Sequence, residues 1–285
     1  MKNILKTIIR KFSPYSFFLE RRIILLEKKI KTISLDIAST KYQLISDKLV
    51  LGKNNKKLIV SMTSYGKRIK QSHLAISSLL LQSIEADKLI LWLSFDEIVT
   101  SELLCLQKKH ANFEIKYCSD MKSYKKIIPI LKECNDEIII TVDDDIIYPF
   151  FFVEKLYRAY DNDPTVINCY RAHKMTFRSD GTIKKYNNWD YEYHANSSSH
   201  YLLPTSGAGM IFTKEHFYKD ITNYDLAMEL SPTADDLWFK VMALMNNTKC
   251  KVIEGNLMQG FISIDSDDEQ ALSKINVINK KNSVF

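Results

Sequence analysis

The amino-acid sequence predicts an α/β fold, with a mostly parallel central sheet flanked by helices and an N-terminal helical extension. From Leu58 onward, short β-rich apolar runs alternate with helical stretches, a pattern typical of parallel strands covered on both faces. Apolar residues make up 46% and charged residues 26% of the chain, which is an ordinary globular composition. The length of 285 residues leaves room for one large domain at 51–285 and an appendage at 1–50.

The strands of this domain are expected at short runs rich in β-branched residues: 58–62, 88–93, 113–117, 137–142, 166–170 and 210–212. The helices are expected where apolar residues recur with helical spacing: 70–83, 101–109, 124–133, 150–160 and 237–245. Asp180 and Gly181 predict the turn of a hairpin over 175–186, and the aromatic stretch 189–200 predicts an irregular loop.

The excess positive charge lies entirely in the appendage. Residues 1–50 hold 11 Lys and Arg against 4 Asp and Glu, a balance of +7, whereas residues 51–285 carry a balance of −1. The main domain therefore has no global field for nucleic acid, and no nucleic-acid partner is expected.

Within the segment 1–18, residues 1–12 predict a basic amphipathic helix, which Pro14 interrupts and aromatic residues follow. This pattern favours an anchor on an anionic membrane surface, and a helix packed on the protein itself is the alternative. Within 19–44, apolar residues from Leu19 to Ile37 follow the spacing of a coiled-coil seam, which predicts homo-oligomerisation through a short heptad helix. A helical hairpin or a docked helix would produce the same spacing.

The sequence also predicts a cytoplasmic protein, peripheral at the inner face of the cytoplasmic membrane. No stretch reaches the roughly 18 consecutive apolar residues of a membrane span, and the N-terminus does not have the pattern of a secretory signal. The five cysteines are odd in number, widely spaced and never in a CxxC arrangement, which disfavours a disulfide framework or a zinc site. We expect each of them to be a small buried hydrophobic residue.

Three adjacent carboxylates, Asp143, Asp144 and Asp145, directly follow the predicted strand EIIITV. In open α/β sheets the ligand crevice lies beyond the carboxyl ends of the strands, so this cluster should face it. The three charges would raise one another's pKa unless a cation lies nearby. Along extended chain Asp143 and Asp145 point the same way and Asp144 points away, so the outer two are the expected ligands of Mn²⁺ or Mg²⁺. A solvated acidic loop is the alternative.

Several other site types have no match in the sequence. The cluster lacks the spacing of an EF-hand loop, and the chain contains no phosphate-binding P-loop, no GxGxxG and no HExxH.

An ordered set of segments resembles the nucleotide-sugar glycosyltransferases of the GT-A fold, more closely the family-2-like bacterial enzymes that build capsule and lipopolysaccharide. The segments are LIVSMTSYGKRI (58–69), DKLILWLS (87–94), SYKKIIPILKE (123–133), IIITVDDDIIYP (138–149), SGAGMIF (206–212) and ADDLWFK (234–240). The resemblance covers about 50–285 and implies a GT-A-like, Rossmann-like sheet. It also implies a metal-dependent hexosyltransferase that uses a DXD motif in polysaccharide biosynthesis.

The resemblance assigns roles to particular residues. It implies nucleotide contacts from Thr63, Ser64, Tyr65, Arg68, Asp96, Lys125, Asp143 and Asp144, and a metal held by Asp143 and Asp145. It implies donor-sugar or acceptor contacts from Arg171, His173, Gly207, Gly209 and Trp238.

The acidic pair Asp235 and Asp236 resembles the pair that supplies the catalytic base in inverting members. The helix dipole would keep such a carboxylate ionised. We expect one of the two to cap the helix and Asp236 to act as the base, whereas a purely capping role for Asp235 is the alternative.

One departure from the family concerns the metal. Many metal-dependent relatives place a His late in the chain, but here none follows His216. Asp265, Asp267 and Asp268 are the candidate substitutes, or the metal is held by the aspartates, the diphosphate and water alone.

The sequence thus predicts transfer of a sugar from a nucleotide-diphosphate donor, a UDP-sugar before others, to a hydroxyl of a glycan or lipid-linked glycan acceptor. Two alternatives stay open. One is a metal-dependent phosphoryl-transfer enzyme or hydrolase that uses the Asp143–Asp145 cluster, and the other is a non-enzymatic scaffold.

Overall fold

The computed structural model describes residues 56–194, 197–254 and 260–264. Three predicted features lie outside these residues: the amphipathic helix expected at 1–12, the heptad helix expected at 19–44, and the candidate ligands Asp265, Asp267 and Asp268.

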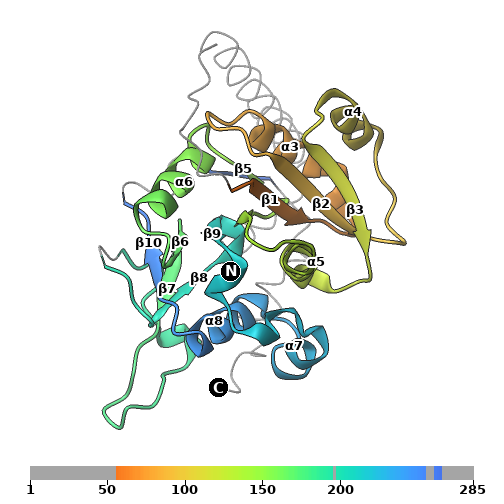
Figure 1. Ribbon diagram of the computed structural model, residues 1–285. Coiled ribbons are helices and arrows are strands. Elements are labelled where there is room, and N and C mark those ends of the chain that lie inside the picture. Colours follow the sequence, from red (N-terminus) through yellow and green to blue (C-terminus); the bar gives the residue numbers. More distant parts are fainter. Residues whose placement is uncertain (1–55, 195–196, 255–259, 265–285) are drawn as a thin grey trace, which may run out of the picture. The chain divides into compact units, whose positions relative to one another are not determined.

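Within the described residues, seven strands form the central sheet in the order β10-β6-β9-β4-β1-β2-β3 (Figure 1). Their bounds are β1 Leu58–Thr63, β2 Lys88–Ser94, β3 Phe113–Cys118, β4 Ile138–Thr141, β6 Ile167–Cys169, β9 Met210–Phe212 and β10 Cys250–Val252. Strand β9 runs antiparallel to β4 and β6, and the other neighbours pair in parallel. The predicted α/β fold with a mostly parallel sheet is confirmed.

Two small antiparallel pairs accompany the central sheet. They join β5 (Ile146–Ile147) to β11 (Ile262–Ser263) and β7 (Ala172–Lys174) to β8 (Leu202–Pro204). The predicted hairpin is confirmed by a bridge between Phe177 and Ile183 and by Gly181, which has a positive φ of 82° at the turn.

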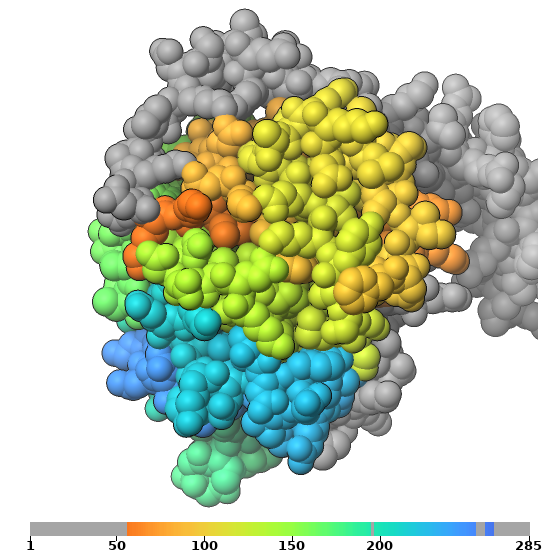
Figure 2. All heavy atoms as spheres, turned by 45° about the vertical axis from the view of Figure 1, so that its right-hand side comes forward, coloured from red at the N-terminus to blue at the C-terminus, as the bar shows by residue number. Residues whose placement is uncertain are grey.

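Helices cover both faces of the sheet. Those of one side in Figure 1 are α3 (Ile69–Leu80), α4 (Ser101–Lys109) and α6 (Phe152–Asn162); those of the other are α5 (Ile128–Glu133), α7 (Tyr224–Leu230) and α8 (Asp235–Met245). The 3-10 turn η6 (Lys219–Thr222) packs against both α5 and α8, and Figure 2 shows the surfaces of these segments lying against one another.

The helix predicted over 124–133 is wrong at its N-terminal end. A 3-10 turn, η2 (Lys122–Lys126), comes first, and α5 begins only at Ile128. Pro129 explains the break, because inside a continuous helix its ring would clash with the carbonyl of Lys125, whereas proline suits the first turn of a helix.

The sheet forms the core of the domain. Strand β4 is completely buried and β1 is buried along all but its last residue, as expected for parallel strands covered on both faces. Of the five free cysteines, Cys134, Cys169 and Cys250 are buried as predicted, but the prediction is wrong for Cys105, which is exposed, and for Cys118, which is half-buried. None of the helices in the described part of the chain is long and apolar enough to cross a bilayer.

Gly209 marks the tightest contact between this sheet and α6. Its φ is +105°, and a Cβ there would lie 2.5 Å from the Phe152 ring. We predict that Gly209→Ala lowers the free energy of unfolding by about 2 to 4 kcal/mol, because it adds backbone strain to overpacking. Urea denaturation measures the loss.

Gly181→Ala is the matched control, because Gly181 has a φ of +82° with nothing within 4 Å of the added Cβ. Only backbone strain acts there, so a loss of about 1 kcal/mol is expected. Equal losses in the two variants would contradict the close contact with Phe152.

Candidate functional site

A cavity of about 1410 Å³ opens beyond the carboxyl ends of β1, β2 and β4. This is the position at which open α/β sheets bind ligands. The predicted site residues that line it are Thr63, Tyr65, Arg68, Asp96, Lys125, Asp143, Asp144, Asp145, Arg171, His173, Gly207, Asp235, Asp236 and Trp238. Ser64 and Gly209 lie outside this lining.

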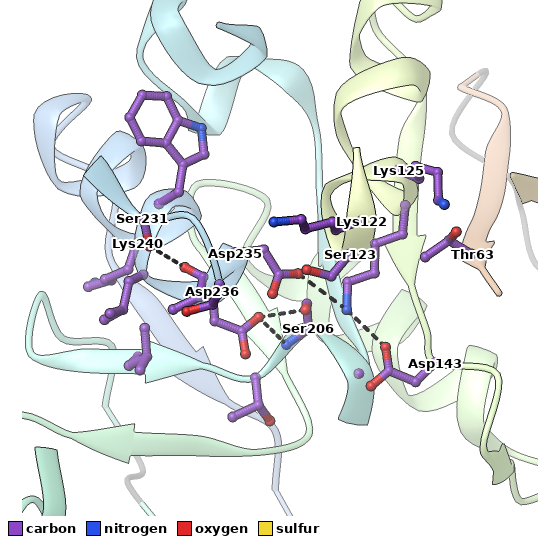
Figure 3. A pocket seen from close by; sticks show the side chains of 18 of the residues that line it. Thr63, Lys122, Ser123, Lys125, Asp143, Ser206, Ser231, Asp235, Asp236 and Lys240 are labelled. Atoms are coloured by element: carbon purple, nitrogen blue, oxygen red, sulfur yellow. Dashed lines mark hydrogen bonds and ion pairs between the residues drawn. The ribbon is translucent and has the colours of Figure 1, made fainter. Parts of the chain in front are cut away.

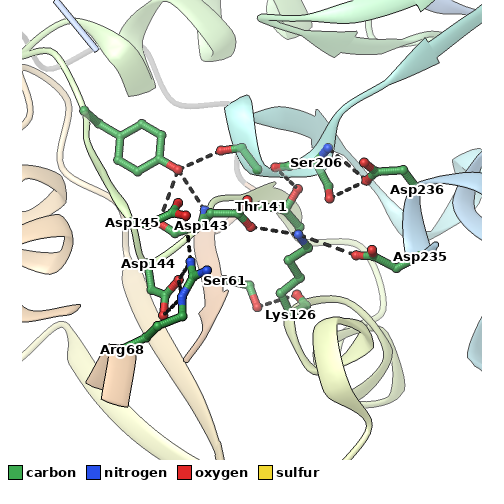
Figure 4. Close-up of polar contacts among 12 residues, drawn as sticks. Ser61, Arg68, Lys126, Thr141, Asp143, Asp144, Asp145, Ser206, Asp235 and Asp236 are labelled. Atoms are coloured by element: carbon green, nitrogen blue, oxygen red, sulfur yellow. Dashed lines mark hydrogen bonds and ion pairs between the residues drawn. The ribbon is translucent and has the colours of Figure 1, made fainter. Parts of the chain in front are cut away.

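A buried lysine joins the two acidic clusters across the cavity (Figure 4). The Nζ of Lys126 lies 2.8 Å from Asp143 at the end of β4 and 3.5 Å from Asp235 at the start of α8. Lys126 is only 5% exposed, and its backbone carbonyl accepts a hydrogen bond from the Ser61 hydroxyl of β1. The lysine is therefore fixed at both its main chain and its side chain.

The charges around Lys126 shift one another's titration. Burial lowers the pKa of Lys126, but Asp143 and Asp235 outweigh that effect and raise it. Burial raises the pKa of Asp143, but Lys126 and the more distant Arg68 hold it below its ordinary value. Lys126 and Asp143 are consequently both charged at neutral pH.

Arg68 is the counter-ion of the other two aspartates. Its guanidinium pairs with Asp144 and, at 2.8 Å, with Asp145, while the Ser64 hydroxyl donates to Asp144. Asp144, which was predicted to point away from Asp143 and Asp145, is 5% exposed and is turned toward Arg68.

Part of the electrostatic repulsion predicted among the three aspartates remains at Asp145. Burial and the charge of Asp143 raise its pKa to about 6, although Arg68 acts in the opposite direction. Cations supplied by the chain itself, Arg68 and Lys126, thus relieve the acidic cluster only in part.

Asp236 is fixed by a neighbouring backbone segment. Its Oδ1 accepts hydrogen bonds from the backbone N–H of Ser206 (3.0 Å) and from its hydroxyl (2.5 Å), as Figure 3 shows. Ser206 is held in turn by the Thr141 hydroxyl of β4, which donates to the Ser206 carbonyl.

The capping role expected for Asp235 or Asp236 is wrong. Helix α8 begins at Asp235 itself, so Ala234 occupies the N-cap position, and no side chain caps the first turn. The pKa of Asp236 is also not held low by the helix dipole, because burial and the adjacent Asp235 raise it to about 6. One buried oxygen of Asp235, Oδ2, accepts no hydrogen bond from the described residues and contacts only Lys126.

Gly207, which the resemblance assigns to donor-sugar or acceptor contact, is approached closely by a side chain of the protein itself. A Cβ at Gly207 would lie 1.7 Å from the Asp143 carboxylate, so only glycine leaves room for this aspartate. The Tyr148 hydroxyl donates to the Gly207 carbonyl and accepts a hydrogen bond from the Asp143 N–H. Gly209 faces Phe152 in the core, as described above.

The predicted nucleotide side of the cavity is polar. Thr63 donates to the Trp92 carbonyl, and the ammonium of Lys125 lies 2.7 Å from the Ser94 hydroxyl and 2.9 Å from Asp120. Asp96 is exposed at the rim.

The segment between β7 and β8 supplies an aromatic side of the cavity. Tyr186, Trp189 and Tyr191 line it, and the rings of Tyr186 and Tyr191 contact His173. His173 Nδ1 accepts the backbone N–H of Glu192, and burial, together with Arg171, lowers the pKa of His173 to about 4. His173 is therefore a neutral imidazole with its Nε2 protonated. Trp238 lies in the core, where its indole donates to the Ile221 carbonyl.

The carboxylates fit a divalent cation that arrives together with a phosphate group. Within the described residues, no three carboxylate, imidazole or thiol groups come together as a metal site. Asp143 and Asp145 nevertheless offer hard oxygen ligands beside a large cavity, and Mg²⁺ is commonly held by one or two carboxylates plus substrate phosphates.

The observed roles of Asp120, Lys126 and Ser206 were not predicted from the sequence. Asp120 follows the end of β3 as Asp96 follows β2, so the strand-end rule could have identified it. Lys126 lies in the segment SYKKIIPILKE (123–133), whose sequence does not indicate a bridge to Asp143 and Asp235. Ser206 carries no sequence signal, because its contact with Asp236 depends on the pairing of β9 with β4.

The functional assignment rests on the geometry of the cavity, because comparison with known proteins does not identify a family for this chain. No protein-family model and no curated protein matches the chain. One similar solved structure is that of 4-diphosphocytidyl-2C-methyl-D-erythritol synthase, with 9% sequence identity, a TM-score of 0.44, and coverage of 78% of this chain and 99% of that chain. A similarity of this size carries no argument about function.

Proposed function

We propose that the protein is a metal-dependent glycosyltransferase that moves a sugar from a nucleotide-diphosphate donor to a hydroxyl of an acceptor glycan. The observation that carries the proposal is that two acidic pairs, Asp143 with Asp145 and Asp235 with Asp236, line one cavity at the strand ends. A transferase of this class needs one group to receive a cationic diphosphate complex and another to accept a proton.

The first pair would receive the donor. Asp143 and Asp145 would hold Mn²⁺ or Mg²⁺, whose positive charge stabilises the departing diphosphate. Thr63, Tyr65 and Asp96 line the adjoining part of the cavity and would bind the nucleoside of the donor. Uridine, from a UDP-sugar, is the first candidate.

The second pair would act on the acceptor. Asp236 would accept the hydroxyl proton as the acceptor oxygen forms its bond to the anomeric carbon and the bond from that carbon to the diphosphate oxygen breaks. The Ser206 contacts fix this carboxylate, and its pKa of about 6 leaves it mostly ionised at neutral pH. A single displacement of this kind inverts the anomeric configuration. Family resemblance in the sequence motifs adds a surface glycan, of capsule or lipopolysaccharide type, as the acceptor class.

Donor turnover tests this proposal. We predict that, with Mn²⁺ and a panel of nucleotide sugars, Asp145→Ala and Asp236→Ala each lower turnover at least about 100-fold. EDTA should abolish wild-type turnover and added Mn²⁺ should restore it. Asp180→Ala is the matched control, because Asp180 lies in the hairpin turn and outside the cavity lining.

Wild-type rates in both cavity variants would defeat the proposal. Release of inorganic phosphate from simple phosphate esters, abolished by Asp145→Ala, would favour the phosphoryl-transfer alternative instead.

The pH dependence of transfer reports the base. Because the pKa of Asp236 is raised to about 6, this carboxylate is protonated below that pH and cannot accept a proton. We predict that kcat/KM falls about tenfold per pH unit below pH 6 and levels off above it. A profile that stays flat from pH 5 to 8 would contradict the assignment of Asp236.

A further inference from the structure

The cavity has an aliphatic arm that the proposed chemistry does not use. Leu230 at the end of α7 and Val241 and Leu244 on α8 all line the cavity, yet they are 54%, 44% and 38% exposed. Large aliphatic side chains that stay open to solvent inside a cavity indicate an apolar ligand.

These side chains form a continuous stripe along one helix. Leu237, Val241 and Leu244 have i, i+4, i+7 spacing and share a face of α8, and each lines the cavity. At 1.5 Å per residue, Leu244 lies about 12 Å along the helix axis from Asp236. The stripe therefore leads away from the proposed base.

The segment between β7 and β8 adds further apolar surface to the same cavity. Ile183 and Tyr191 line it and are 49% and 47% exposed. Tyr186, in the same segment, lines the cavity together with Asp236. The strand-end side, in contrast, carries the ionised groups Arg68, Lys126 and Asp143.

We propose that this arm binds an aliphatic group attached to the acceptor, so that the acceptor is an amphiphile: a sugar joined to a lipid. This inference rests on the proposed function, because that function places the acceptor hydroxyl at Asp236. The separation of the cavity into a charged strand-end side and an aliphatic side matches a charged donor and an amphiphilic acceptor.

Binding of alkyl glycosides tests the inference without any turnover. The probes are methyl, hexyl and decyl glucosides below their micelle concentrations, and titration followed by tryptophan fluorescence gives the dissociation constants. We expect affinity to rise roughly twofold to fourfold per added methylene. Val241→Ser and Leu244→Ser should remove most of this dependence on chain length.

Met245→Ser is the matched control. Met245 is 54% exposed on the same helix but does not line the cavity, so the dependence on chain length should persist in this variant. Equal affinity for methyl and decyl glucosides, or an equal loss in Met245→Ser, would overturn the inference, because the second result indicates general adhesion to an apolar surface.

Asp236→Asn separates this inference from the proposed function. It should abolish transfer and leave the dependence of alkyl-glucoside affinity on chain length in place. If alkyl binding persists in an enzyme that turns over no nucleotide sugar, the proposed function fails and the aliphatic site stands. If transfer occurs but chain length has no effect on binding, the aliphatic site fails alone.

Discussion

The ion bridge from Lys126 to Asp143 and Asp235 is the constraint on which the site depends. It joins the end of β4 to the start of α8, two segments separated by more than eighty residues in the chain. A buried charge left without a partner costs about 3 to 5 kcal/mol, so buried Lys126 must keep at least one of these two aspartates beside it. The bridge thus keeps the proposed donor-binding and proton-accepting groups on one cavity.

Local features of the fold bring these charges together. Ser61 of β1 and Thr141 of β4 lie side by side in the sheet and reach toward the same face, where one holds the Lys126 backbone and the other holds Ser206. Gly207 leaves the space that the Asp143 carboxylate fills. The site is therefore assembled by the register of the sheet, and the side chains that touch a ligand are supported by others that do not.

Much of this architecture was predictable from the sequence. Periodicity located the strands and most helices, the strand-end rule placed Asp143 and Asp145 at the cavity, and the family resemblance added Asp96. The sequence did not predict which side chains pair with these aspartates. The sequence shows that three carboxylates are adjacent, but not that Arg68 and Lys126, which lie 76 and 17 positions away from their nearest partners, neutralise them. Likewise, the helix dipole suggested a readily ionised Asp236, whereas burial beside Asp235 dominates in the folded chain.

A double-mutant cycle between Lys126 and Asp235 tests the ion bridge most directly. The free energies of unfolding of Lys126→Met, Asp235→Asn and the combined variant, measured in urea at neutral pH, give the coupling between the two side chains. We predict a coupling of at least about 1 kcal/mol, with the double variant more stable than the sum of the single losses implies. Additive losses would show that Lys126 does not hold α8 to the acidic end of β4, and the account of a single shared site would then be wrong.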